Sequence, residues 1–185
     1  VMFTIDTETG FEDTVIINAS YGLGEMIVQG KVTPDEFTVL KPTLAQGFKS
    51  IIAKDLGEKK SKIIYASKGI KEVKVAPADS AVYCLKDEEI LQLAKWGAQI
   101  EEYFSKKHNR HQPMDIEWAK DGKTKKLFIV QARPETVHAS SDKNIYKEYH
   151  LKEIGKLLTQ GTAVGTKIAS GKVRVIQDAK RISDF

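Results

Sequence analysis

The sequence has 185 residues, enough for one ordinary domain or for one domain with a piece of another. Apolar residues make up 41% and charged residues 29%, a balance that is typical of a globular protein and excludes a disordered or collagen-like chain. The net charge is +4, and no apolar segment approaches the ~18 residues of a membrane span, so we expect no contact with a membrane.

Two β-branched, apolar segments predict the first strands, at residues 1–5 and 14–19. The first begins without a cap or polar tail, and the sequence stops just after another strand-like segment. We therefore expect this chain to be a piece of a longer protein.

A glycine-rich segment follows the second strand: Ser20-Tyr21-Gly22-Leu23-Gly24-Glu25. Gly-x-Gly after a strand can let the backbone approach a phosphate, but the Gly-Lys-Ser/Thr of a Walker loop is missing. The local pattern favours a glycine turn before a short helix that ends by Gly30, with Glu25 as a carboxylate in its first turn.

Lysines are concentrated between Lys41 and Lys74, where they are spread among acids and apolar residues. No arginine and no interleaved aromatic set accompanies them, so the pattern favours a solvated surface over a polyanion site, with ATP phosphates as a further alternative. We expect no nucleic-acid partner. Further strands are predicted at residues 37–40, 62–66 and 72–75.

Cys84 is the single cysteine, which excludes an internal disulfide and a zinc site made of several cysteines. Such cysteine usage suggests a reducing compartment, and we expect a cytoplasmic protein. The segment around Cys84 predicts a small buried side chain rather than a reactive thiol.

Residues 87–107 predict the clearest helix of the chain. Asp87 suits the N-cap, and Lys106 and Lys107 suit the C-terminal end of the helix dipole. A core-facing stripe recurs at the helical spacing of three and four residues: Ile90, Leu93, Gly97, Ile100 and Phe104.

The most informative segment is a predicted hairpin, with strands at residues 114–119 and 127–133 and a turn around residues 121–122. If the strands pair about Thr124, Glu117 lies opposite Gln131 and Asp115 lies opposite Arg133. These four side chains then share one face, which we call the polar face. The opposite face is expected to be apolar and to pack on a core through Ile116, Trp118, Phe128 and Val130.

The polar face has a chemical logic. Mg²⁺ prefers oxygen ligands and takes one or two from protein, which Glu117 and the amide oxygen of Gln131 could supply. Arg133 could hold phosphate oxygens as a permanently charged fork. The alternative is a half-buried hairpin whose polar face meets solvent, with Asp115 and Arg133 as a cross-strand pair, and the pattern alone favours this alternative.

The chain becomes polar beyond Thr136, which predicts a domain boundary. We expect an α+β domain at residues 1–138, built from an antiparallel sheet with packed helices. A helical linker is predicted at residues 139–160, and the first strands of a second domain at residues 161–185.

Three segments in this order resemble the phosphoenolpyruvate synthase (pyruvate, water dikinase) family of PEP-utilising enzymes. They are GLGEMIVQGKVTPDEF at residues 22–37, MDIEWA at 114–119 and IVQARPET at 129–136. The resemblance implies that residues 1–138 form the C-terminal part of an ATP-grasp domain. Residues 161–173, GTAVGTKIASGKV, resemble the start of the family's swivelling phosphohistidine domain.

The resemblance also implies roles for individual residues. Glu117 and Gln131 match residues that bind magnesium and nucleotide, and Arg133 matches one that contacts the phosphates, so Glu117 and Arg133 would count as catalytic. Asp115 matches a residue of the same site, and Glu25 matches a glutamate near the nucleotide.

The whole enzyme would convert ATP, pyruvate and water to phosphoenolpyruvate, AMP and phosphate through a phosphohistidine. The resemblance implies that the phosphate-carrying histidine and the pyruvate-binding barrel lie outside this sequence, so the fragment would be inactive alone, and the full-length enzyme is expected to be homo-oligomeric. A related dikinase, a rifampin phosphotransferase and a non-catalytic nucleotide-binding module remain as alternatives.

Overall fold

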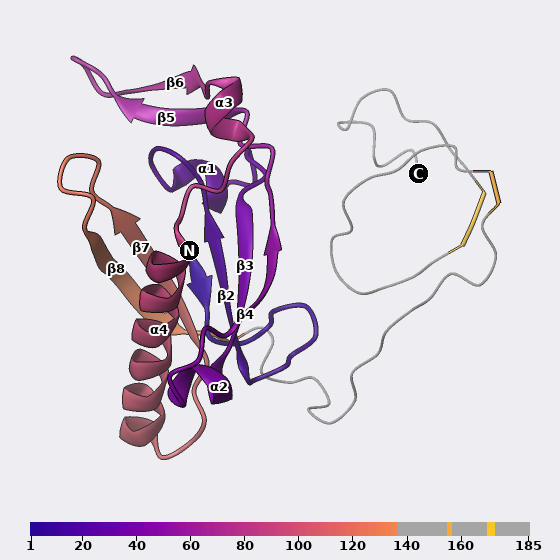
Figure 1. Ribbon diagram of the computed structural model, residues 1–185, viewed down its shortest axis with the longest axis vertical. Coiled ribbons are helices and arrows are strands. Elements are labelled where there is room, and N and C mark those ends of the chain that lie inside the picture. The colour runs from indigo at the N-terminus through magenta and orange to yellow at the C-terminus, as the bar shows by residue number, and fades with distance from the viewer. Residues whose placement is uncertain (137–154, 157–169, 173–185) are drawn as a thin grey trace. The chain divides into compact units, whose positions relative to one another are not determined.

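The computed structural model describes residues 1–136, 155–156 and 170–172 (Figure 1). The chain divides into two units, residues 1–148 and 149–185, and the fold described here is that of the first. Apart from residues 155–156 and 170–172, the predicted helical linker and the predicted strands beyond residue 161 lie outside the described residues.

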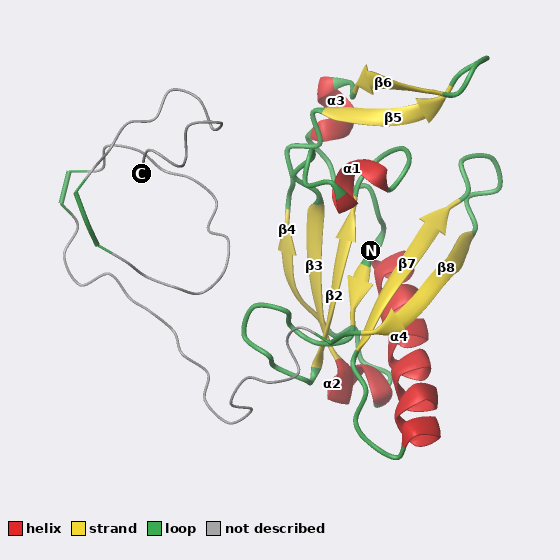
Figure 2. Ribbon diagram, turned by 180° about the vertical axis from the view of Figure 1, so that it is seen from behind, coloured by secondary structure: helices red, strands yellow, loops and turns green. Residues whose placement is uncertain are grey.

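Six antiparallel strands form the main sheet, in the order β4-β3-β2-β1-β7-β8 (Figure 2). Their bounds are Met2–Phe3 for β1, Thr14–Ala19 for β2, Asp35–Leu40 for β3, Ile51–Asp55 for β4, Met114–Lys120 for β7 and Leu127–Pro134 for β8. β1 is antiparallel to both of its neighbours, since Met2 pairs with Ile17 on one side and with Ile116 on the other. β2 and β7 therefore run in the same direction, and the chain leaves both strands at the same end of the sheet.

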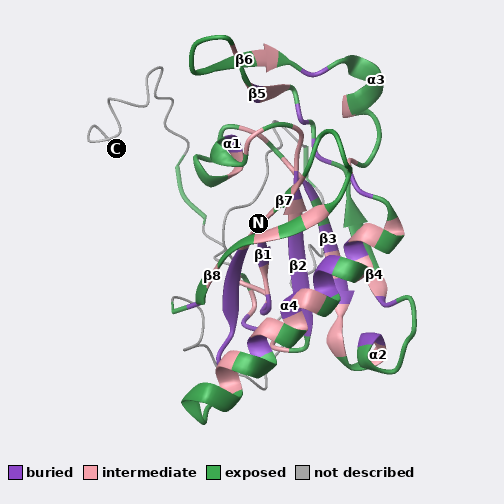
Figure 3. Ribbon diagram, turned by 90° about the vertical axis from the view of Figure 1, so that its left-hand side faces the viewer, coloured by how far each residue is buried: buried purple, intermediate pink, exposed green. Residues whose placement is uncertain are grey.

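One long helix, α4 (Asp87–His108), packs against one face of this sheet and closes the core (Figure 3). The predicted helix and its apolar stripe are confirmed, because Ile90, Leu93 and Gly97 are buried and Ile100 and Phe104 are partly buried against the core. The predicted N-cap is wrong by one residue. Lys86 occupies that position, and its backbone N–H donates to the Glu89 carboxylate three residues later (3.0 Å).

A two-stranded sheet, β5 (Ser61–Tyr65) with β6 (Ile70–Lys74), stands apart from the main sheet. Three short helices complete the described elements: α1 (Glu25–Val28), α2 (Lys41–Ala45) and α3 (Pro77–Ser80). The sequence patterns missed β4, α2 and α3. β4 is an edge strand whose side chains are mostly exposed, so it lacks the alternation that marks a half-buried strand.

Two lysines of the lysine-rich stretch are not on a solvated surface, so that prediction is wrong for them. Lys59 is fully buried and pairs with the fully buried Asp35. The Lys41 ammonium lies 2.7 Å from the carboxylate of Glu101, a buried acid on α4. Buried charges need partners, and these partners lie too far along the chain for a local pattern to reveal them.

Candidate functional site

The polar face of the hairpin has the predicted pairing. Asp115 lies opposite Arg133, and Glu117 lies opposite Gln131. Directly opposite residues of an antiparallel pair have Cβ atoms about 4.5–5.5 Å apart, so a carboxylate and an amide stand side by side, with a guanidinium one position further along the same face.

The opposite face of the hairpin differs from the prediction, because the register shifts between Glu117 and Trp118. Trp118 pairs with Ile129, and Val130 is displaced from the ladder as in a β-bulge. Ile116 and Trp118 pack toward the core as predicted, but Phe128 and Val130 are 51% and 63% exposed. Leu127 and Ile129 take their places against the core.

Arg133 is held in place by Asp115. Its Nε donates to Asp115 Oδ2 at 2.8 Å, and its Nη2 lies 2.6 Å from the same oxygen. This hydrogen bond raises the pKa of Arg133 above its already high value. The Asp115 side chain is only 10% exposed whereas that of Arg133 is 65% exposed, so the acid anchors the guanidinium and leaves its outer side accessible to an anion.

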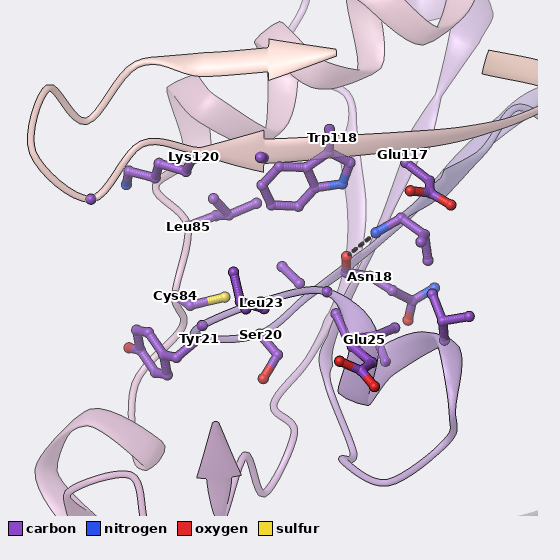
Figure 4. Close-up of a pocket in the computed structure, with 18 of the residues that line it drawn as sticks. Asn18, Ser20, Tyr21, Leu23, Glu25, Cys84, Leu85, Glu117, Trp118 and Lys120 are labelled. Atoms are coloured by element: carbon purple, nitrogen blue, oxygen red, sulfur yellow. Dashed lines mark hydrogen bonds between the residues drawn. The ribbon is translucent and has the colours of Figure 1, made fainter. Parts of the chain in front are cut away.

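A cavity of about 700 Å³ opens where the chain leaves β2 and β7. Figure 4 shows Trp118 and Lys120 on the side of the hairpin, and Ser20, Tyr21 and Glu25 on the opposite side, with Cys84 and Leu85 between them. Its volume is in the range of small-molecule sites, which are usually apolar clefts with a few polar groups.

Glu25 and Glu117 both line this cavity, from opposite sides (Figure 4). The structure thus brings together two predicted site residues that are far apart in the sequence. Asp115, Gln131 and Arg133 are not among the lining residues. Glu117 is therefore the residue that the cavity shares with the polar face of the hairpin.

The two glycines of residues 20–25, which we call the glycine loop, have different roles. Gly22 has a φ of +81°, and a Cβ there would lie 2.4 Å from the carbonyl oxygen of Ile63. Gly24 has an ordinary helical conformation, and a Cβ there would meet nothing within 4 Å. The N–H of Leu23 donates to the Ile63 carbonyl (2.9 Å), so this amide serves the fold and is not available to a phosphate.

Two buried side-chain atoms of the cavity wall have no hydrogen-bond partner within the described part of the protein: Ser20 Oγ and Trp118 Nε1. Buried polar groups are normally hydrogen-bonded, so the protein alone leaves these two donors unsatisfied. Sequence reasoning missed both. It treated Trp118 only as core packing, and it included Ser20 in the glycine-rich segment without giving its side chain a role.

A metal ion at this site would depend on the polar face. Across the residues that the structure describes, no three His, Cys, Asp or Glu side chains come together as metal ligands. Glu117 and Gln131 pair across the strands, and their oxygens are of the kind that suits Mg²⁺, which usually takes one or two protein oxygens and completes its shell with phosphates and water.

No helix in the described part of the chain is both long and apolar enough to cross a membrane.

The fold and the site together define a class of protein: an α+β ligand-binding domain with a cavity beside a face that suits a cation and an anion.

The sequence comparison identifies the family within that class. Residues 1–153 match the family model described as "Pyruvate phosphate dikinase, AMP/ATP-binding domain", and the chain belongs to this family. The predicted resemblance to the PEP-utilising enzymes is confirmed.

Proteins named phosphoenolpyruvate synthase are similar to the whole chain or nearly all of it. The protein of Aquifex aeolicus is 54% identical over 100% of this chain and 22% of its own length. That of Synechocystis is 52% identical over 100% of the chain and 23% of its own length, and that of Escherichia coli is 45% identical over 99% and 23%. The chain thus spans less than a quarter of the length of these curated relatives.

Proposed function

We propose that this domain binds ATP together with Mg²⁺, as the C-terminal part of an ATP-grasp domain. One observation carries the proposal: the strand register puts a carboxylate beside an amide oxygen, and an anchored guanidinium on the same face. The family match to an AMP/ATP-binding domain supports the choice of ligand.

Each polar residue has a distinct task in this proposal. Glu117 and Gln131 hold Mg²⁺, which when bound neutralises charge on the phosphates. Arg133 binds phosphate oxygens, and Asp115 orients the guanidinium rather than touching the nucleotide. Glu25 approaches the nucleotide from the other side of the cavity. Phosphoryl transfer requires positioning and charge neutralisation, which this arrangement can supply without a covalent step on the domain.

We further propose that the longer protein converts ATP, pyruvate and water to phosphoenolpyruvate, AMP and phosphate through a phosphohistidine. The names of the relatives support this acceptor over a related dikinase or a rifampin phosphotransferase. The chain alone would bind nucleotide without turnover, because it spans too little of those relatives to hold every part of the reaction. A cytoplasmic, homo-oligomeric enzyme remains our expectation.

The test is a titration with ATP in the longest form of the protein that carries this chain, with tryptophan fluorescence as the readout. Glu117→Gln keeps the volume of the side chain but removes its charge, and we expect the affinity for ATP in excess Mg²⁺ to fall by about tenfold or more. Glu102→Gln is the matched control, because Glu102 lies exposed on α4 and pairs with Lys106 at the surface. Equal affinities of the two variants would rule out the proposed site.

The same variants separate the enzyme from a non-catalytic module. A module that only senses nucleotide would bind ATP but release no AMP when pyruvate is added. An enzyme would lose its pyruvate-dependent release of AMP in the Glu117→Gln variant and keep it in the Glu102→Gln variant.

A further inference from the structure

One short segment, residues 57–63, is linked to two walls of the cavity, to one through Asp35 and to the other by direct contact. The first wall is Cys84 with Leu85, and the second is the glycine loop, residues 20–25. The segment lies in the middle of the lysine-rich stretch, and neither the motifs nor the proposed chemistry gives it a role.

The first end of the segment is fastened to Asp35. Lys59 Nζ donates to Asp35 Oδ1 and also to the carbonyl oxygen of Gly57 (2.9 Å). The N–H of Gly57 donates to the same Asp35 oxygen at 2.9 Å. A Cβ at Gly57 would lie 2.2 Å from the carbonyl of Pro34, so the segment packs directly on the backbone that precedes Asp35.

Asp35 also binds the first wall of the cavity. Its second carboxylate oxygen, Oδ2, accepts the backbone N–H of Cys84 at 2.8 Å. Cys84 and its neighbour Leu85 line the cavity. One buried carboxylate therefore joins Lys59 and Gly57, which do not touch the cavity, to a wall that does.

The other end of the segment supports the second wall. The carbonyl oxygen of Ile63 accepts the N–H of Leu23, and the missing side chain of Gly22 allows the two backbones to approach this closely. The Lys62 ammonium lies 5.6 Å from the centre of the Tyr21 ring, at cation–π distance.

Full burial of the Asp35–Lys59 pair is informative because such a pair adds little stability of its own. Removing two charges from water costs about as much as their attraction returns, so well-packed apolar residues of similar size often stabilise a fold equally well. What apolar residues cannot do is accept the N–H groups of Gly57 and Cys84. The carboxylate therefore fixes the geometry of the wall.

We propose that residues 57–63 are a positioning segment of the nucleotide cavity, and that Lys59 acts through Asp35 on the Cys84–Leu85 wall. The identity of the ligand rests on the function proposed above. The fixing of the wall does not, and it can be tested without any nucleotide.

Cys84, as the single cysteine of the chain, provides the readout. Two causes raise the pKa of its thiol to about 12: burial, which is the larger, and the hydrogen bond to Asp35. Alkylation is therefore expected to be slow in the native protein. The variant Lys59→Met should speed alkylation by about tenfold or more, at a temperature where circular dichroism shows the protein folded. Lys60→Met is the matched control, because Lys60 is the next residue and its side chain is 78% exposed. Equal rates in the two variants would overturn the proposal.

A double variant separates positioning from simple stabilisation. Asp35→Leu with Lys59→Met removes both buried charges at similar volume, so the melting temperature should return toward that of the native protein. Alkylation of Cys84 should stay fast, because the new side chain cannot accept the Cys84 N–H. Recovery of the native alkylation rate together with the melting temperature would show a merely structural pair and overturn the proposal.

A third measurement needs no substitution. Hydrogen exchange of the native protein should find the amides of Gly57, Cys84 and Leu23 protected, in contrast to that of Lys68 in the β5–β6 turn. Exchange of all three at the rate of Lys68 would overturn the proposal, whatever the variants do.

Mg²⁺-ATP then tests the ligand separately. If ATP slows the alkylation of Cys84 in the native protein, the nucleotide binds in the cavity. If the variants behave as expected but ATP does not change the alkylation rate of the native protein, the positioning role is supported and the proposed function is contradicted.

Discussion

Replacing Gly22 by alanine tests how the glycine loop is held against β5. Gly22 has a φ of +81°, and a Cβ at this position would lie 2.4 Å from the carbonyl oxygen of Ile63 and 3.0 Å from Lys62 Cβ. The first of these neighbours is backbone in a paired strand and cannot turn aside. The loop must therefore move, and the hydrogen bond from Leu23 to Ile63 must lengthen or break.

The expected loss has two parts. The left-handed conformation costs a residue with a Cβ about 1–2 kcal/mol. Loss of the Leu23 hydrogen bond adds about 0.5–1.5 kcal/mol, and more if the carbonyl of Ile63 is left buried without a donor. We expect a total of about 2–4 kcal/mol. For a folded unit of this size that corresponds to a fall in melting temperature of about 5–15 °C.

Gly69→Ala is the control that isolates the close contact. Gly69 lies in the turn between β5 and β6 with a φ of +72°, but a Cβ there would meet nothing within 4 Å. In urea denaturation, the free energy of unfolding of Gly69→Ala should fall only by the conformational cost, about 1–2 kcal/mol. Hydrogen exchange should find the Leu23 amide unprotected in Gly22→Ala and protected in Gly69→Ala. Equal losses of stability and equal protection would refute the reasoning.

Other predictions concern charge, packing and catalysis. Partial desolvation and the nearby carboxylate of Asp55 raise the pKa of Glu36, although its side chain is largely exposed, so its ionisation opposes folding weakly. Glu36→Gln should raise the melting temperature slightly at pH 7, and the gain should fade as the pH falls below 4.5, where the acid is protonated even when unfolded. Trp118→Ala should lower the free energy of unfolding, measured in urea, by about 3 kcal/mol. This is the low end for a large aromatic, because the ring is only partly buried. An unchanged free energy of unfolding would contradict its packing role. Gln131→Ala should reduce Mg²⁺-dependent turnover of the longer enzyme by orders of magnitude without changing its melting temperature, and unchanged turnover would exclude this residue as a metal ligand.

The polar face of the hairpin was predictable because its information is local. Side chains alternate along a strand and the turn residues are recognisable, so pairing about Thr124 placed Asp115 opposite Arg133 and Glu117 opposite Gln131. The same argument failed between the bulge and the turn, where Trp118 pairs with Ile129 and not with Val130. A bulge displaces Val130, and no residue type in the segment marks the position of a bulge.

The buried charges were not predictable, because their partners are distant in the chain. Lys59 looked like one more solvated lysine until folding placed it against Asp35 without exposure to water. Likewise the buried Glu101 on α4 pairs with Lys41, from a distant part of the chain, and with His111, in the segment between α4 and β7.

The family, the long helix, most of the strands and the residues of the polar face could all be predicted from local patterns in the sequence. Each of these follows from a short period or a short motif. That Glu25 and Glu117 line one cavity depends on the sheet topology, because β1 lies between β2 and β7 and makes both strands end on the same side. Tertiary contacts alone also bring residues 57–63 against Asp35 and the glycine loop. The physical reason is the same in both cases: contacts between distant segments depend on how faces pack, and a local pattern specifies the face but not its partner.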